Sequence, residues 1–76
     1  MKVTVVYFAS LRERMGTSGC VTSLDQGDTV ADLWQRLAGD ADTERVLCAV
    51  NQQNSSYHER LNDGDEVAFF PPVTGG

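Results

Sequence analysis

Apolar and polar residues alternate along the chain with two different periods, which divide it into short strands and one clear helix. Residues 3–8 are rich in β-branched and aromatic side chains and predict a strand. Because apolar residues fall on both sides of this strand, we expect it to be central in a sheet and covered on both faces. The main helix is predicted over 30–38, where the apolar residues recur at helical spacing: Val30, Leu33, Trp34, Leu37 and Ala38. We expect Trp34 to lie in the core.

Both ends of the main helix carry signals of their own. Thr29 and Asp32 match a capping box, in which each residue bonds the backbone N–H of the other. Gly39 can adopt the left-handed conformation that ends a helix. The same signals predict a shorter helix near the N-terminus, with Ser10–Glu13 as the capping box and Gly16 as the stop.

The remaining periodic segments predict further strands and a stiff exit from the last one. The strands are expected at Cys20 to Leu24, Val46 to Val50, weakly near Tyr57, and Glu66 to Phe70. Pro71 and Pro72 end the last strand, because proline cannot donate to a sheet ladder. This order indicates an α+β fold, a β-grasp mixed sheet with the main helix packed on it. We assign residues 1–70 to this domain and 71–76 to an extended C-terminal Gly-Gly tail.

Length and charge narrow the classes of function. A chain of 76 residues builds one modest core, which leaves little room for an interior active site. The formal net charge is −5, and Lys2 is the sole lysine. Because phosphate binding depends on clustered Lys and Arg, we expect no nucleic-acid partner and favour a basic protein surface instead.

Several residue types that often carry chemistry are interpreted here as structural. Cys20 and Cys48 are too far apart for a CxxC pair, and we expect small apolar residues in strands rather than a disulfide. His58 lies alone in a polar segment, and no metal-ligand cluster is visible. The sequence shows no targeting signal and no membrane-spanning stretch, so we expect a cytoplasmic protein without a membrane partner.

The end of the chain has unusual physical properties. Val73 and Thr74 extend the segment beyond the prolines, and Gly75 and Gly76 have no side chains, so the tail can enter a narrow slot. The terminal carboxylate, with a reference pKa near ~3.5, is ionised at neutral pH and is a poor electrophile. Adenylation would activate it. We therefore expect the Gly76 carboxylate to be the reactive group.

A family resemblance rests on these residues. The run Asp63-Gly64-Asp65-Glu66-Val67-Ala68-Phe69-Phe70-Pro71-Pro72-Val73-Thr74-Gly75-Gly76 resembles the ending of the molybdopterin synthase branch of the MoaD/ThiS sulfur-carrier family. Phe8-Ala9 with Arg12-Glu13, and Ala49-Val50-Asn51, resemble the first strand and helix and the central strand of that family. Thiazole-forming relatives share the Gly-Gly end but generally lack Phe-Phe-Pro-Pro.

The resemblance implies a ubiquitin-like β-grasp fold and a role as a sulfur carrier. An E1-like activating enzyme would adenylate Gly76 with ATP and Mg²⁺, and a sulfur donor system would convert it to a thiocarboxylate. The tail, Pro71, Pro72, Val73, Thr74 and Gly75, would enter the large subunit of molybdopterin synthase, where sulfur passes to the pyranopterin precursor. Catalytic side chains would belong to the partners, this chain would bind no cofactor or metal, and the family suggests a heterotetramer.

Strand alternation and the resemblance together indicate a partner interface. Phe69 and Phe70 point to opposite faces of their strand, and we expect Phe70 to be exposed. By resemblance, Phe8 and Arg12 would join Phe70, although Phe8 could equally be core and Arg12 a solvated charge. The segment Gln53-Asn54-Ser55 is polar where many members of the family are apolar.

Three other functions stay open from the sequence alone. The chain could carry sulfur for thiazole and thiamine synthesis. It could be a ubiquitin-like modifier conjugated through Gly76 to lysine amines of other proteins. It could also be a passive binding module that uses the acidic segment 40–44.

Overall fold

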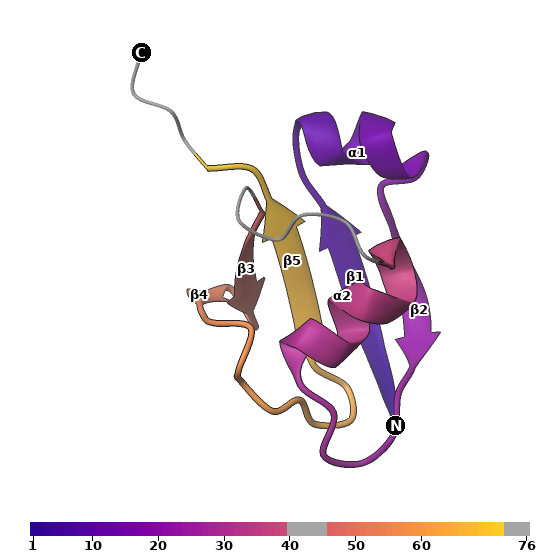
Figure 1. Cartoon of the computed structure of the whole chain (residues 1–76), viewed down its shortest axis with the longest axis vertical. Coiled ribbons are helices and arrows are strands. Elements are labelled where there is room, and N and C mark those ends of the chain that lie inside the picture. The colour runs from indigo at the N-terminus through magenta and orange to yellow at the C-terminus, as the bar shows by residue number, and fades with distance from the viewer. Residues whose placement is uncertain (40–45, 73–76) are drawn as a thin grey trace.

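The computed structural model describes residues 1–39 and 46–72, which form a five-stranded mixed sheet and two helices (Figure 1). The elements are β1 (Lys2–Tyr7), α1 (Ser10–Met15), β2 (Gly19–Ser23), α2 (Val30–Ala38), β3 (Leu47–Val50), β4 (Gln53–Asn54) and β5 (Glu66–Phe70). The strand order is β2-β1-β5-β3-β4, with β1 and β5 parallel and the other pairs antiparallel. Neither helix within this part of the chain is long and apolar enough to cross a membrane.

The core lies between one face of the sheet and α2, which crosses β1 and β5 in Figure 1. Val30, Leu33 and Trp34 of α2 are fully buried, as the helical stripe predicts. The Trp34 ring lies 4.7 Å from the ring of Phe69 between centroids, so the predicted core role of Trp34 is confirmed. A mixed sheet with one helix packed across it is the predicted β-grasp arrangement.

The prediction that both faces of β1 are covered is wrong. Val3, Val5 and Tyr7 point into the core, whereas Thr4 is exposed and Val6 is half-buried on the other face. β1 does lie inside the sheet, between β2 and β5. We call the face of the sheet that α2 does not cover the open face. The run of apolar residues in β1 arises because Val6, on the open face, lies between the core residues Val5 and Tyr7.

The helix signals are confirmed at the start of α2 and are wrong in part at its end and for α1. Gly39 follows α2 with φ 65° and ψ −131°, which is a positive φ but not the predicted left-handed helical conformation. Thr29 donates its backbone N–H to Asp32 Oδ2 at 2.8 Å, and Thr29 Oγ1 accepts the Asp32 N–H at 3.3 Å. Gly16 ends α1 in the left-handed conformation. The Ser10 capping box does not form, because the N-cap is Ala9, with φ 54° and no side-chain cap bond.

The predicted strand near Tyr57 is also wrong. The fourth strand is β4, two residues that pair with β3 across a short turn. Tyr57 lies in a turn, where its hydroxyl donates to the Val46 carbonyl oxygen at 2.8 Å and its ring stacks near Phe69. An aromatic residue that fills the core from a loop has the same sequence signal as one in a strand.

Candidate functional site

The open face carries an apolar ledge at the end where β5 leaves the sheet. We define the apolar ledge as Phe8, Phe70 and Leu47, which lie on three neighbouring strand ends. Leu47 is directly opposite Phe70 in the β3–β5 ladder. The backbone N–H of Phe8 donates to the Phe69 carbonyl oxygen at 3.1 Å, which places Phe8 beside the end of β5.

The two phenylalanines of β5 face opposite sides of the sheet as the sequence predicts, although Phe70 is less exposed than expected. Phe69 is fully buried beneath α2, and Phe70 is half-buried on the open face. Phe8 is 47% exposed and Leu47 is 45% exposed, so the alternative that Phe8 belongs to the core is wrong. Two exposed large apolar side chains beside a half-buried third form an apolar patch, and such a patch marks a candidate protein interface.

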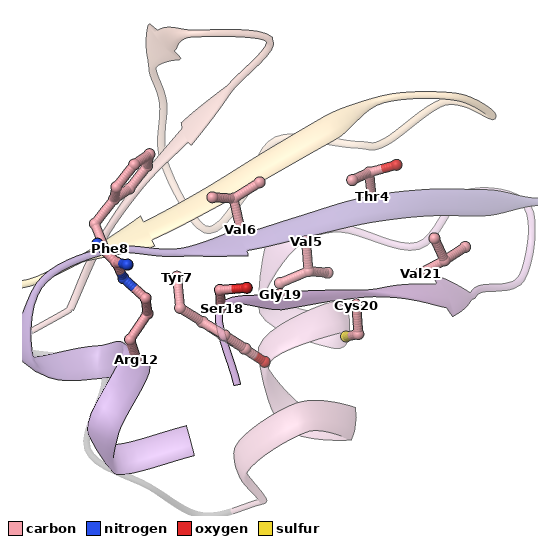
Figure 2. A pocket seen from close by; sticks show the side chains of 10 residues that line it. All are labelled: Thr4, Val5, Val6, Tyr7, Phe8, Arg12, Ser18, Gly19, Cys20 and Val21. Carbon is pink, nitrogen blue, oxygen red and sulfur yellow. The ribbon is translucent and has the colours of Figure 1, made fainter. Parts of the chain in front are cut away.

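A shallow hollow on β1 and β2 brings Arg12 to the same site (Figure 2). Phe8, Val6 and Thr4 project from one side of β1, and Tyr7 from the other. Arg12 is exposed on α1 and lines the hollow together with Phe8. The complete lining is Thr4, Val5, Val6, Tyr7, Phe8, Arg12, Ser18, Gly19, Cys20 and Val21. The site therefore combines an apolar surface with one accessible cation.

The floor of the hollow depends on a close approach of two strands at Gly19. A Cβ atom at this position would lie 2.2 Å from the Val5 carbonyl oxygen. Thr17 Oγ1 donates to the Gly19 carbonyl at 2.9 Å and holds the chain where it enters β2. Glycine is thus required by the space between β1 and β2, since a real Cβ contact is never this short.

The tail begins beside the ledge. β5 ends at Phe70, Pro71 is half-buried and Pro72 is exposed. Val73, Thr74, Gly75 and Gly76, which the sequence predicts to be the inserted and reactive part, lie outside the described residues, as does the acidic segment 40–44. The ledge is therefore the last surface of the domain before the chain continues to Gly76.

The groups with clearly shifted pKa values are Tyr7, Tyr57 and Cys48, which pack in or against the core, and Asp32 at the start of α2, whose pKa is lowered by its hydrogen bonds with Thr29. Burial raises the pKa of Tyr7 and of Tyr57 to about 12, and it also raises the pKa of the Cys48 thiol. Cys20 and Cys48 lie in β2 and β3 with free thiols, in the structural positions expected. Among residues 1–39 and 46–72, no group of three or more His, Cys, Asp or Glu side chains is placed to hold a metal ion.

Comparison with known proteins identifies relatives of this chain in sequence and in fold. The ThiS family model matches residues 5–76. The chain belongs to the ThiS family. The molybdopterin synthase sulfur carrier subunit of Escherichia coli K12 is 43% identical, with 97% of this chain and 99% of that protein covered. The corresponding subunit of Mycobacterium tuberculosis is 38% identical, with 100% of this chain and 99% of that protein covered.

A solved structure of another protein has the same fold as this chain. SAMP1, small archaeal modifier protein 1, from Haloferax volcanii has a TM-score of 0.85 and 27% identity, with both chains covered completely. The ubiquitin-like β-grasp fold that the sequence predicts is thereby confirmed. The resemblance to the sulfur-carrier family is confirmed as well.

Sequence reasoning missed two exposed apolar residues of the open face. Leu47 belongs to the ledge, and Val21 is 67% exposed on β2, next to Thr4. For both residues the strand pattern alone gives no decision, because it does not say which of two neighbouring residues faces the core until the pairing of β3 with β5 and of β2 with β1 is known.

Proposed function

We propose that this chain is the sulfur-carrier subunit of a molybdopterin synthase, with the Gly76 carboxylate as the sulfur-bearing group. The observation that carries the proposal is the apolar ledge of Phe8, Phe70 and Leu47 at the strand end that leads to Gly75-Gly76. Full-length identity of 43% to a subunit of that name supports this assignment over thiazole synthesis.

The chemistry follows from the low reactivity of a carboxylate. One Gly76 oxygen attacks the α-phosphorus of ATP bound to the activating enzyme with Mg²⁺, and pyrophosphate leaves. A sulfide-level nucleophile then forms a C–S bond and displaces AMP, which leaves a thiocarboxylate. In the large subunit this sulfur forms a bond to a carbon of the pyranopterin precursor and displaces an oxygen substituent from that carbon. Water then cleaves the acyl–sulfur bond, which leaves the sulfur on the precursor and restores the Gly76 carboxylate. Two such transfers supply the two sulfurs of the dithiolene.

The domain's own contribution is docking and presentation. The open face binds the partner through the ledge, and Arg12 pairs with a carboxylate there. Pro71 and Pro72 stiffen the exit, so the two glycines enter the partner's active site at a set distance from the ledge. The chain itself binds no cofactor, it works in the cytoplasm, and the partners supply the catalytic side chains. The assembly is a heterotetramer of two large and two small subunits.

Changing the length of the tail tests this function. Deletion of Gly76, or addition of one residue after it, is expected to reduce sulfur transfer by at least about 100-fold, because the reacting atom is lost or misplaced. The fold and the affinity for the large subunit should change little, since the ledge is untouched. Equal transfer by either variant would rule out Gly76 as the donor. The matched control is Ser23→Ala, which changes one exposed residue of β2 outside the ledge and the tail and keeps the length of the tail.

A second candidate function is protein modification through the same activated terminus. It is favoured by the likeness to SAMP1, which is named a modifier protein. The two functions diverge at the nucleophile, which is sulfide for a carrier and a lysine amine for a modifier. Proteins in cells that are joined to the Gly76 carboxyl through a lysine amide bond, and that disappear when Gly76 is deleted, would favour modification.

A further inference from the structure

A single asparagine binds the turn between β3 and β4 to the start of β5. Asn51 donates its backbone N–H to the Glu66 carbonyl oxygen at 2.8 Å, and its Oδ1 accepts the Glu66 N–H at 3.0 Å. Its Nδ2 donates to Asp65 Oδ1 at 3.0 Å. Asn51 has φ 52° and Gln52 has φ 70°, a left-handed pair that suits a two-residue hairpin turn. Three hydrogen bonds thus join this turn to Asp65 and Glu66.

Asp65 is fixed in turn by the rest of the sheet. Its Oδ2 accepts the Asn62 N–H at 2.7 Å, and its own N–H donates to the Asn62 carbonyl at 3.1 Å. Its carbonyl oxygen accepts the Thr4 N–H at 2.9 Å, which ties it to β1. Both carboxylate oxygens therefore have a donor. The Asn51–Asp65 pair lies where β1, β5 and the β3–β4 hairpin meet.

Hydrophobic burial alone does not exclude every wrong register between β3 and β5. A slip of one residue between β3 and β5 would turn the buried side chains of one of the two strands, such as Cys48 or Phe69, out of the core, and burial opposes it strongly. A slip of two residues keeps the inward and outward faces but shifts Phe70 along the ladder by about 6.6 Å. Leu47 would then no longer lie opposite Phe70. Asn51 opposes this slip, because its three bonds reach only one position of β5.

We infer that Asn51 and Asp65 are positioning residues for the docking face, because their pair sets the register that places Leu47 opposite Phe70. Phe70 lies five residue steps after Asp65, a span of about 17 Å along β5, so the pair acts on the ledge through the strand. The inference rests on the proposed function for the meaning of the ledge. The register itself can be measured without any partner.

An exchange of the two side chains tests the pair. Asn51→Asp alone brings two carboxylates face to face, and Asp65→Asn alone brings two amides face to face. The double variant Asn51→Asp/Asp65→Asn restores one donor and one acceptor, keeps an oxygen for the Glu66 N–H, and keeps another for the Asn62 N–H. Asn62→Ala is the matched control, because Asn62 contacts Asp65 through its backbone.

Two readouts are needed on each purified full-length variant. The first is amide hydrogen exchange at Glu66 together with the nuclear Overhauser contact between Leu47 and Phe70. The second is the Kd for the large subunit of molybdopterin synthase. In each single variant, the amide exchange rate at Glu66 and the Kd for the large subunit are each expected to rise about 10-fold. In the double variant both quantities should return to within about 2-fold of the parent, because the two residues are coupled neighbours.

The outcomes separate this inference from the proposed function. Single variants that keep parental exchange and the Leu47–Phe70 contact overturn the inference, as does a double variant no better than the singles. Parental affinity in a single variant whose contact is lost also overturns it. A parent chain that does not bind the large subunit at all refutes the proposed interface, while the first readout still decides whether the pair sets the register.

Discussion

The backbone N–H of Phe8 donates to the carbonyl oxygen of Phe69 at 3.1 Å, so the end of β1 is tied to the strand that continues toward Gly76. The two side chains have opposite surroundings, since Phe69 is fully buried and Phe8 is 47% exposed. This bond makes β1 part of the surface from which the tail departs. Changes at Phe8 and Phe69 should therefore have different consequences.

Phe8→Ala is expected to weaken binding of the large subunit by about 10- to 100-fold, in the range of a central aromatic contact, with little effect on thermal stability. Phe69→Ala should instead lower the free energy of unfolding by about 3 to 5 kcal/mol, because it empties the core. Titration calorimetry and urea denaturation measure the two effects. Unchanged affinity in Phe8→Ala would remove Phe8 from the interface.

Arg12 should act on the rate of docking. Within the described part of the chain the ion pair present is Arg36–Asp25 at 3.5 Å, and Arg12 is exposed beside the ledge. Arg12→Ala is expected to slow association with the large subunit several-fold at low salt and to flatten the salt dependence of that rate. Stopped-flow mixing measures both. A rate with the parental salt dependence would mean that Arg12 is a solvated charge.

Gly19→Ala should destabilise the domain through a steric clash. The new Cβ would lie 2.2 Å from the Val5 carbonyl oxygen, so β2 must move away from β1, at a cost of at least about 2 kcal/mol in unfolding free energy. Ser23→Ala, exposed on the same strand, is the control and should stay within about 0.5 kcal/mol. The denaturant concentration at the midpoint of unfolding, measured for both variants and the parent, compares their stabilities. Equal midpoints would contradict the close approach of the two strands.

Stability should fall at alkaline pH because of the two tyrosines. Burial raises the pKa of both Tyr7 and Tyr57 from 10.0 to about 12 in the folded chain. Their contribution is complete below pH 10, where both states are protonated, and it is lost between pH 10 and about 12, where the unfolded chain releases protons first. Tyrosinate absorbance should therefore appear together with unfolding. Full ionisation near pH 10 in a folded chain would be inconsistent with this burial.

Local signals in the sequence predicted the parts of the fold that depend on local chemistry. The stripe from Val30 to Ala38 and the Thr29–Asp32 capping box determine α2 because burial and capping coincide there. The alternation of Phe69 and Phe70 placed one in the core and one on the surface. The exposure of Phe8 was not decidable, since a strand-end aromatic packs inward or outward according to what covers that face.

The missed features depend on contacts between distant segments. Ser10 had the composition of an N-cap, but the β1–α1 connection turns at Ala9 with φ 54°, which moves the start of the helix by one residue. β4 is two residues long and exists because the turn at Asn51 and Gln52 folds it back on β3. The register between β3 and β5, and with it the place of Leu47 in the ledge, follows from pairing rather than from local pattern.

The central claim is that sulfur is carried on the carboxyl group of Gly76. The most direct test is the intact mass of the full-length protein after incubation with its activating enzyme, ATP, Mg²⁺ and sulfide, followed by fragmentation to locate the change. We expect the mass increase of one oxygen-to-sulfur exchange, located at Gly76 and absent when ATP is omitted. An unchanged mass under these conditions, or a sulfur located at Cys20 or Cys48 instead, would contradict it.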